Sequence, residues 1–460
     1  MARSVESVNA VIKAYDVRGV VGEQIDTDFV RDVGASFARL VRDEQSGAEA
    51  VTRVAIGHDM RESSPELSRA FAEGVVAQGL DVIHIGLAST DQLYFASGIL
   101  DCPGAMFTAS HNPAKYNGIK LCRAGAKPVG QDTGLGVITR EVAEGVPAYD
   151  GPVGQVSEEE LLDQYASFVR GLVDLAELRP LKIAVDAGNG MGGHTVPAVF
   201  GPMPVTVLPL YFELDGSFPN HEANPLDPAN LVDLQEHVRA TGADIGLAFD
   251  GDADRCFVVD EKGNPVSPSA VTALVADREL AKEPGATVIH NLITSRFVPE
   301  LVEKLGGTAV RTRVGHSFIK QQMAETGAVF GGEHSAHYYF RDFWGADSGM
   351  LAALHVLAAL GEQDRPLSEL MQSYEAYAAS GEINSTVADA AERTAAVVDL
   401  FADRTVSVDR LDGVTVDLGD GAWFNLRASN TEPLLRLNVE ARTSADVDAL
   451  VAEILGAVRA

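Results

Sequence analysis

The chain has 460 residues, of which 46% are hydrophobic and 22% are charged, as in an ordinary globular protein. Its net charge of -30 would repel nucleic acid and anionic membranes, so we expect neither as a partner. The apolar run Met350 to Leu360 is too short to span a membrane, and the first residues lack a signal-peptide core. We therefore expect a cytoplasmic protein whose three cysteines, Cys102, Cys122 and Cys256, are buried free thiols.

After an amphipathic segment at about residues 28–41, one order of elements occurs three times along the chain. Each copy has a strand, a helix, a second strand, a further helix and a third strand that ends in a polar loop. The copies start near residues 54, 182 and 287, and Ser295 is expected to cap the first helix of the third copy. This order predicts α/β domains with largely parallel sheets, whose ligands bind at the carboxyl ends of the strands.

The residues from about 382 onward differ, because they alternate as strands before a final helix that Thr443 is expected to cap. They predict a small α+β domain. We therefore expect domains at residues 1–154, 155–262, 263–378 and 379–460.

The first polar loop is Thr108-Ala-Ser-His-Asn-Pro113, which places a serine hydroxyl beside a histidine on a turn-forming sequence. A serine on a turn can carry a covalent intermediate if neighbouring groups activate it and stabilise its charge. Serine, asparagine and proline are also ordinary turn residues, so this loop alone does not separate a nucleophile from a surface turn.

The second polar loop is Asp250-Gly-Asp-Ala-Asp-Arg255, with a carboxylate at every second residue and then a guanidinium. Carboxylates this close repel one another unless a cation screens them, so the pattern favours a divalent cation with a phosphate nearby. Asp250, Asp252, Asp254 and Glu261 also fall at EF-hand ligand positions. Arg255, however, stands where an EF-hand loop needs glycine, and the flanking segments are predicted strands rather than helices.

Two further loops carry residues suited to a sugar phosphate. Gly331-Gly-Glu-His-Ser-Ala-His337 ends the third copy, and Arg427-Ala-Ser-Asn-Thr-Glu-Pro433 lies between strands of the last domain. An arginine, short polar side chains and the amides of a turn can cradle a phosphate, although a polar hairpin loop would have a similar composition.

Together the four loops resemble those of the α-D-phosphohexomutase family, in the order of its four domains and over essentially the whole chain. They are similar to its phosphoserine loop, magnesium loop, sugar-recognition loop and phosphate-binding loop, in that order. The resemblance implies three related α/β domains with mixed, largely parallel sheets, and a C-terminal α+β domain, around a central cleft.

The resemblance also implies a reaction. Ser110 would carry a phosphoryl group, and a phosphoserine oxygen with Asp250, Asp252 and Asp254 would hold Mg²⁺. A hexose phosphate would bind its phosphate in a cradle and take the phosphoryl group on its opposite hydroxyl. The resulting hexose 1,6-bisphosphate, which is also the expected activator, would turn over and return its other phosphate to Ser110. The cradle residues would be Arg427, Ser429, Asn430 and Thr431.

The remaining positions that match residues lining the family's site are Tyr15, Arg18, His111, Lys120, Arg255, His316, Glu333, Ser335 and His337. Arg18, His111 and Lys120 would act in catalysis beside Ser110, with Lys120 either carrying a proton or only supplying charge. Arg255 would balance the phosphoserine. Glu333 and Ser335 would bridge adjacent ring hydroxyls in either orientation of the sugar.

Some positions depart from the closest family pattern. Ile293 stands where many members active on both glucose and mannose carry a lysine, and Arg296 is the substitute that we expect to contact the second phosphate. His334 and Ala336 replace methionine and glycine of the commonest sugar loop, which could narrow the choice of sugar.

We expect a phosphomannomutase that interconverts mannose 6-phosphate and mannose 1-phosphate, with activity on glucose phosphates as a further expectation. The alternatives are a phosphoglucomutase, a phosphoglucosamine mutase, a metal-dependent sugar phosphatase and a non-catalytic sugar-phosphate sensor. Asn430 and His334 disfavour the glucosamine branch, which usually has glycine and glutamine there. The expected partner is a small-molecule hexose phosphate, bound by a monomer or homodimer.

Overall fold

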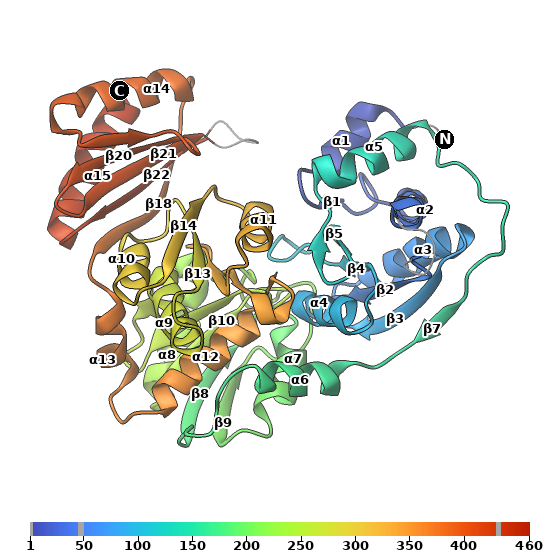
Figure 1. Cartoon of the computed structure of the whole chain (residues 1–460), viewed down its shortest axis with the longest axis horizontal. Coiled ribbons are helices and arrows are strands. Elements are labelled where there is room, and N and C mark those ends of the chain that lie inside the picture. The colour runs from blue at the N-terminus through green and yellow to red at the C-terminus, as the bar shows by residue number, and fades with distance from the viewer. Residues whose placement is uncertain (1–2, 45–49, 429–433) are drawn as a thin grey trace. The chain divides into compact units, whose positions relative to one another are not determined.

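The computed structural model describes residues 3–44, 50–428 and 434–460 (Figure 1). The chain folds into two compact units, one formed by Met1–Val266 and Ser335–Ser368 and the other by Ser267–His334 and Glu369–Ala460. Among the described residues, no helix combines the length and the hydropathy that spanning a membrane requires.

The first sheet of the first unit has seven strands within the described residues, in the order β1-β5-β4-β2-β3-β7, with β6 paired to β5. Strands β4, β2, β3 and β7 run parallel, and β5 and β1 are antiparallel additions. The strands are β1 (Val17–Val20), β2 (Arg53–His58), β3 (Asp81–Leu87), β4 (Gly104–Phe107), β5 (Tyr116–Arg123), β6 (Lys127–Pro128) and β7 (Val156–Glu158). The accompanying helices are α1 (Val5–Val11), α2 (Thr27–Glu44), α3 (Ser64–Ala77), α4 (Thr90–Ile99) and α5 (Leu135–Glu144).

Helix α2 forms because its apolar residues recur at helical spacing, and Phe29, Val33 and Phe37 are buried on one face. It packs directly against α3 through two glycines. A Cβ added at Gly34 would lie 2.3 Å from the carbonyl oxygen of Phe71, and one at Gly74 would lie 2.0 Å from that of Arg31. The two helices therefore approach closely because neither glycine has a side chain at the contact.

The second sheet of the first unit has five strands within the described residues, in the order β12-β11-β10-β8-β9. Strands β10, β8 and β9 are parallel, and β11 and β12 are antiparallel additions. The elements are α6 (Leu162–Gly171), β8 (Leu181–Asp186), α7 (Gly192–Phe200), β9 (Val205–Leu210), α8 (Val232–Thr241), β10 (Ile245–Phe249), β11 (Cys256–Asp260) and β12 (Pro265–Val266).

Residues 335–368 add an antiparallel pair, β16 (Tyr338–Phe340) with β17 (Ala346–Asp347), and the helix α12 (Gly349–Gly361) to the first unit. Helix α12 is buried along almost its whole length. The apolar run from Met350 to Leu360 is therefore a core helix.

The second unit contains three parallel strands in the order β14-β13-β15, followed by the C-terminal sheet. The elements of its first part are α9 (Pro268–Lys282), β13 (Thr287–Asn291), α10 (Phe297–Lys304), β14 (Thr308–Thr312), α11 (His316–Thr326) and β15 (Phe330–Gly332). Helix α10 begins with Arg296 at its N-cap, so the prediction that Ser295 caps it is wrong by one residue. Ser295 lies one residue before this cap, where its Oγ accepts the Phe297 N–H at 3.2 Å and its own N–H donates to Ser269 Oγ at 3.1 Å.

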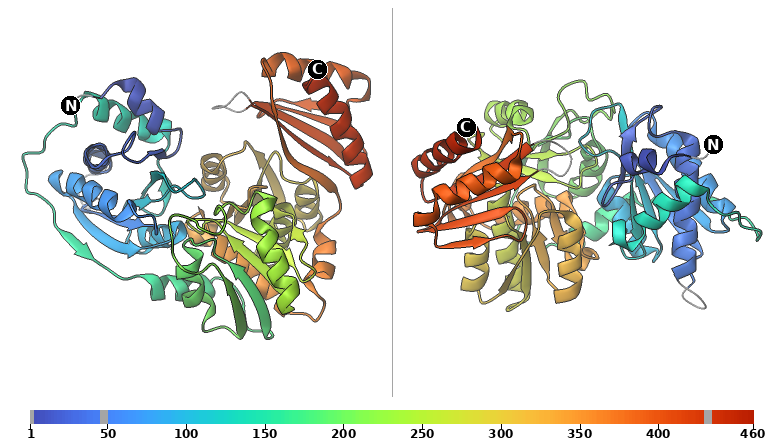
Figure 2. Two further views of the ribbon diagram at one scale, coloured as in Figure 1. Left: turned by 180° about the vertical axis from the view of Figure 1, so that it is seen from behind. Right: turned by 90° about the horizontal axis from the view of Figure 1, so that it is seen from above.

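The C-terminal sheet is antiparallel, in the order β18-β22-β21-β20-β19. Its strands are β18 (Ala378–Thr386), β19 (Ser407–Asp409), β20 (Val414–Gly419), β21 (Ala422–Ala428) and β22 (Leu434–Ala441). Helices α14 (Ala390–Leu400) and α15 (Ser444–Val458) share one apolar core with the sheet and lie together on it (Figure 2). Thr443 caps α15 as predicted, since its Oγ1 accepts the Asp446 N–H at 3.2 Å.

The three α/β copies have the same topology, which confirms the predicted repeat. In each copy the first strand lies between the second and the third, giving β4-β2-β3, β10-β8-β9 and β15-β13-β14. In each, the polar loop follows the third strand. Loops of equivalent topological position therefore carry Ser110, the three aspartates and Glu333. The three cysteines are free and buried, as expected.

We predict that Gly74→Ala lowers the free energy of unfolding by about 1–3 kcal/mol, because the new methyl group would force α2 and α3 apart. Urea denaturation followed by circular dichroism measures the change. Gly171→Ala is the control, because a Cβ at that end of α6 meets nothing within 4 Å. Equal or greater stability of Gly74→Ala than of the control would contradict the packing described.

Candidate active site

The serine loop and the aspartate loop meet inside the first unit. Ser110 lies beyond β4 and is 5% exposed, and its Oγ–H donates to Asp250 Oδ2 at 2.8 Å. A Cβ added at Gly251 would lie 2.3 Å from the carbonyl oxygen of Ser110, so only glycine permits this approach. The structure thus brings together the hydroxyl and the carboxylates that the sequence places 140 residues apart.

Ser110 has a left-handed backbone conformation, with φ of +49°. This conformation costs a residue other than glycine roughly 1–2 kcal/mol, so neighbouring contacts must hold it in place. The hydroxyl of Thr108 accepts the Ser110 N–H at 2.9 Å. The carbonyl oxygen of Ser110 accepts from Arg61 Nη2 at 2.9 Å.

Arg61 is a residue that the sequence analysis did not single out, and it holds the whole serine loop. Besides Ser110, its guanidinium donates to the carbonyl oxygens of Asn112 at 2.7 Å and of Pro113 and Tyr116 at 3.1 Å. Its Nε donates to Asp59 Oδ2 at 3.2 Å. All five N–H donors of the arginine are therefore used, and the side chain is 1% exposed.

The carboxylates of Asp250, Asp252 and Asp254 are at most 1% exposed, and each offers an oxygen within 4.8 Å of the others. Among the described residues, Asp252 Oδ1 and Asp254 Oδ1 have no hydrogen-bond partner. A buried carboxylate oxygen without a partner is costly unless a cation meets it. An all-oxygen donor set of this kind fits a hard divalent cation such as Mg²⁺.

Lys120 and Thr90 fix the orientation of the aspartates. Lys120 Nζ donates to Asp252 Oδ2 at 2.7 Å and to Asp254 Oδ2 at 2.5 Å. Burial alone would lower the pKa of Lys120, but the two carboxylates outweigh it and raise that pKa well above its usual value. Lys120 is therefore positively charged at neutral pH. Thr90, the first residue of α4, donates its hydroxyl to Asp252 Oδ2 at 2.6 Å.

Arg255 connects Asp250 to His111. Its Nη2 lies 2.8 Å from Asp250 Oδ2 and 2.5 Å from His111 Nδ1, which is also 3.2 Å from Ser110 Oγ. Burial, then the charges of Arg255 and Arg18, lower the pKa of His111 to about 2. At neutral pH the imidazole is thus uncharged, with Nδ1 accepting from Arg255.

Arg18 lies on β1 and also contacts the serine loop. Its Nη1 donates to Asn112 Oδ1 at 2.6 Å and its Nη2 to Asp16 Oδ2 at 2.7 Å. Tyr15, which precedes Asp16 in the chain, is 43% exposed. The structure therefore places Arg18 next to the loop it was predicted to serve.

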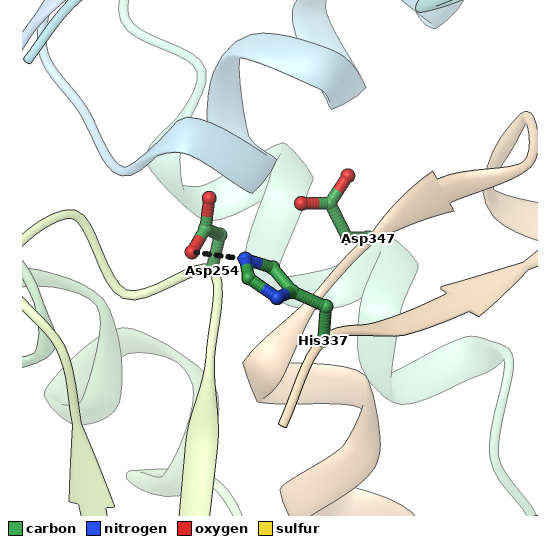
Figure 3. A group of neighbouring side chains, drawn as sticks. All are labelled: Asp254, His337 and Asp347. Carbon is green, nitrogen blue, oxygen red and sulfur yellow. Dashed lines mark ion pairs between the residues drawn. The ribbon is translucent and has the colours of Figure 1, made fainter. Parts of the chain in front are cut away.

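The predicted sugar-recognition residues fall in both units. His337 belongs to the first unit, where its Nε2 lies 3.9 Å from Asp254 Oδ1 and its Nδ1 3.0 Å from Ser335 Oγ (Figure 3). Glu333 belongs to the second unit and is 2% exposed. Its Oε1 accepts the Gly315 N–H at 3.2 Å. Gly315 immediately precedes His316, the first residue of α11.

The predicted phosphate-binding residues belong to the second unit. Arg427 lies 3.7 Å from Glu382 and 4.0 Å from Asp412, whereas Ser429, Asn430 and Thr431 are outside the described residues. Ile293 is buried, and Arg296 Nη2 is paired with Asp417 Oδ2 at 2.6 Å. The phosphate cradle and the substitute role of Arg296 stay predictions.

Comparison with known families and proteins gives matches along the whole chain. The four domain models of one family, described as phosphoglucomutase/phosphomannomutase domains I, II and III and the C-terminal domain, match residues 9–145, 163–263, 267–377 and 382–457. A phosphomannomutase of Escherichia coli K12 is 39% identical over 440 residues, covering 94% of each chain. A Xanthomonas campestris protein named phosphohexose mutases is 40% identical over 436 residues, covering 94% of this chain and 95% of its own.

A solved structure supports the same likeness. The phosphoglucomutase/phosphomannomutase family protein of Burkholderia thailandensis has a TM-score of 0.88 and 32% identity, covering 98% of this chain and 97% of its own.

We predict that Arg61→Lys lowers kcat by roughly 100-fold while KM changes little, because three donors cannot satisfy five acceptors and Ser110 shifts from its place. Steady-state kinetics with thermal unfolding measures both effects. Arg69→Lys is the control, since that exposed arginine donates only to the carbonyl oxygen of Pro65. Wild-type kcat in Arg61→Lys would contradict the positioning role.

Proposed function

Because the chain belongs to the phosphoglucomutase/phosphomannomutase family, we propose that it interconverts mannose 6-phosphate and mannose 1-phosphate through a phosphoserine at Ser110. The chain is a phosphohexomutase, an isomerase that moves a phosphoryl group between positions of a hexose. Relatives about 40% identical that are named phosphomannomutase support the choice of mannose. The observation that carries the mechanism is the 2.8 Å contact between Ser110 Oγ and Asp250 within the buried aspartates.

In the proposed reaction, the hydroxyl oxygen of the hexose phosphate attacks the phosphorus of phosphoserine. The bond from phosphorus to Ser110 Oγ breaks, and the bond from phosphorus to the sugar oxygen forms, which gives a hexose 1,6-bisphosphate. The proton lost by the sugar hydroxyl balances the proton that Ser110 Oγ gains, so the serine hydroxyl is restored. After the bisphosphate turns over, Ser110 Oγ loses its proton and attacks the other phosphorus. The bond from that phosphorus to its sugar oxygen breaks, this oxygen takes a proton, and the isomeric hexose monophosphate is released with phosphoserine restored.

The aspartates would hold the cation that this transfer needs. Asp250, Asp252 and Asp254, with a phosphoserine oxygen, would bind Mg²⁺, which when bound neutralises charge on the transferring phosphoryl group. Two buried carboxylate oxygens without hydrogen-bond partners in the described part of the chain support this assignment. Hexose 1,6-bisphosphate would act as the activator that phosphorylates Ser110.

The basic residues would stabilise charge on the phosphoryl group. Lys120 and Arg255 are both held by the aspartates, so their charges stay beside Ser110 throughout the reaction. Between the two roles expected for Lys120, its raised pKa favours supplying charge over carrying a proton. Arg18 would position the serine loop through Asn112, and His111 would contribute as a neutral imidazole.

The sugar would be recognised in two orientations by the remaining predicted residues. Glu333 and Ser335 would bridge ring hydroxyls, with Tyr15, His316 and His337 lining the site. Arg427, Ser429, Asn430 and Thr431 would hold the phosphate that does not react. We further propose a cytoplasmic monomer or homodimer with domains at residues 1–154, 155–262, 263–378 and 379–460.

An assay of the purified protein with mannose 1-phosphate, glucose 1-phosphate and glucosamine 1-phosphate, each with Mg²⁺ and trace hexose 1,6-bisphosphate, tests the substrate. We expect the highest kcat/KM with mannose 1-phosphate and a 6-phosphate as product. Comparable rates on the glucose compound would remove the preference for mannose. Inorganic phosphate as the main product would instead identify a sugar phosphatase.

We predict that Ser110→Ala reduces turnover to below about 1% of wild type, because Ser110 carries the loop hydroxyl that contacts the aspartates. The same assay measures this, and mass spectrometry checks that phosphate is no longer incorporated. Ser217→Ala, at an exposed serine, should be fully active. Most of the wild-type rate remaining in Ser110→Ala would rule out this nucleophile.

We predict that Asp252→Asn preserves the fold but raises the Mg²⁺ concentration needed for half-maximal rate by roughly 10–100-fold, because a charged ligand is lost. Mg²⁺ titration after treatment with a chelator measures the change. Asp364→Asn, at an exposed carboxylate, is the control. Full activity of either protein in the chelator alone would refute the role of the cation.

A further inference from the structure

Next to the aspartate loop is a second group of possible metal ligands, and it contains a nitrogen donor. We propose that Asp254, His337 and Asp347 form a binding site for a transition-metal dication such as Zn²⁺. The ligand atoms of these three residues lie within 4.8 Å of one another. This trio shares Asp254 with the proposed Mg²⁺ ligands but has two residues of its own.

The fold brings these residues together from two segments of the first unit. His337 lies just before β16, Asp347 ends β17, and β16 and β17 pair with Tyr339 opposite Asp347. The backbone of His337 forms a bridge with Arg255, which places its ring beside the aspartate loop. Figure 3 shows the imidazole between the two carboxylates. Backbone pairing therefore brings the hairpin that carries His337 and Asp347 against the residue that follows Asp254.

The geometry of His337 is that of a metal ligand. Its Nδ1 lies 3.0 Å from Ser335 Oγ, so an Nδ1–H that donates to this hydroxyl leaves the Nε2 lone pair directed at Asp254. Nε2 and Asp254 Oδ1 are 3.9 Å apart, too far for a hydrogen bond. Two ligands of one ion, each bonded at about 2.0–2.2 Å, can have such a separation.

Asp254 has a carboxylate oxygen that faces both trios. Its Oδ1 is buried, is directed at His337, and has no hydrogen-bond partner among the described residues (Figure 3). Asp347 is 2% exposed. One imidazole and two carboxylates with an open fourth position suit Zn²⁺, whereas Mg²⁺ prefers oxygen ligands alone.

Both trios use Asp254, so a Zn²⁺ at the new site and a Mg²⁺ among the three aspartates would compete for this carboxylate. Zn²⁺ at the new site would therefore draw Asp254 away from Mg²⁺ and would block access to His337. We expect Zn²⁺ to inhibit the enzyme and excess Mg²⁺ to reverse this inhibition. This consequence rests on the proposed function, whereas the binding of Zn²⁺ does not depend on it.

Equilibrium dialysis with ZnCl₂, without Mg²⁺, tests the site directly. We expect Asp347→Asn and His337→Gln to weaken Zn²⁺ binding by at least roughly 10-fold. Asp250→Asn should retain it, because Asp250 belongs only to the other trio. The matched control is Asp342→Asn, an exposed carboxylate five residues before Asp347, which should bind as wild type. Loss of binding in Asp250→Asn but not in Asp347→Asn would overturn the site.

Anomalous scattering at the zinc edge, from crystals of the full chain soaked in ZnCl₂, locates the ion independently of activity. A peak bonded to His337 Nε2, Asp254 and Asp347 supports the proposal, even if the protein proves not to be a mannose enzyme. A peak among Asp250, Asp252 and Asp254 alone, or no peak in the first unit, contradicts it. Circular dichroism of each variant excludes loss of the fold as the cause of weaker binding.

Discussion

Three carboxylates are buried around one serine hydroxyl, and their charge is the constraint on which the rest of the first unit depends. When all three are ionised, Asp250, Asp252 and Asp254 exceed the counter-charges of Lys120 and Arg255 by one negative charge. A dication and a phosphoryl dianion arriving together would not change that balance. The buried cluster is therefore electrostatically ready for the pair of groups that phosphoryl transfer requires.

The fold meets this constraint through residues outside the serine and aspartate loops. Helix α4 presents Thr90 to Asp252, while Arg61 turns the carbonyl oxygens of the serine loop toward itself. The Ser110 side chain is consequently left facing Asp250. Because Gly251 alone permits the contact between the two loops, the position of the hydroxyl depends on backbone packing as much as on side-chain chemistry.

The sequence allowed predictions where the residues concerned lie next to one another in the chain or where elements repeat in the same order. The repeated order of strands and helices predicted the common topology. Asp250-Gly-Asp-Ala-Asp predicted a site for a divalent cation, and the structure shows these carboxylates buried close together. Arg61 and Asp347 were not found, because their partners are distant backbone carbonyls or side chains from other segments. For Arg61, the signal in the sequence was a lone arginine after the strand that ends at His58. Without the fold, such an arginine cannot be distinguished from a surface charge.

The central claim is that phosphorylated Ser110 transfers its phosphoryl group to a hexose phosphate. Single-turnover transfer tests it most directly: protein phosphorylated with hexose 1,6-bisphosphate is freed of ligand and mixed with mannose 1-phosphate and Mg²⁺. Phosphorus NMR and peptide mass spectrometry then follow the phosphate. When the phosphoryl group on Ser110 is labelled with ¹⁸O, we predict that the label moves to the 6-position of the hexose and that unlabelled phosphate from the substrate takes its place on Ser110. Phosphate released to water, or a label on any residue other than Ser110, would contradict this mechanism.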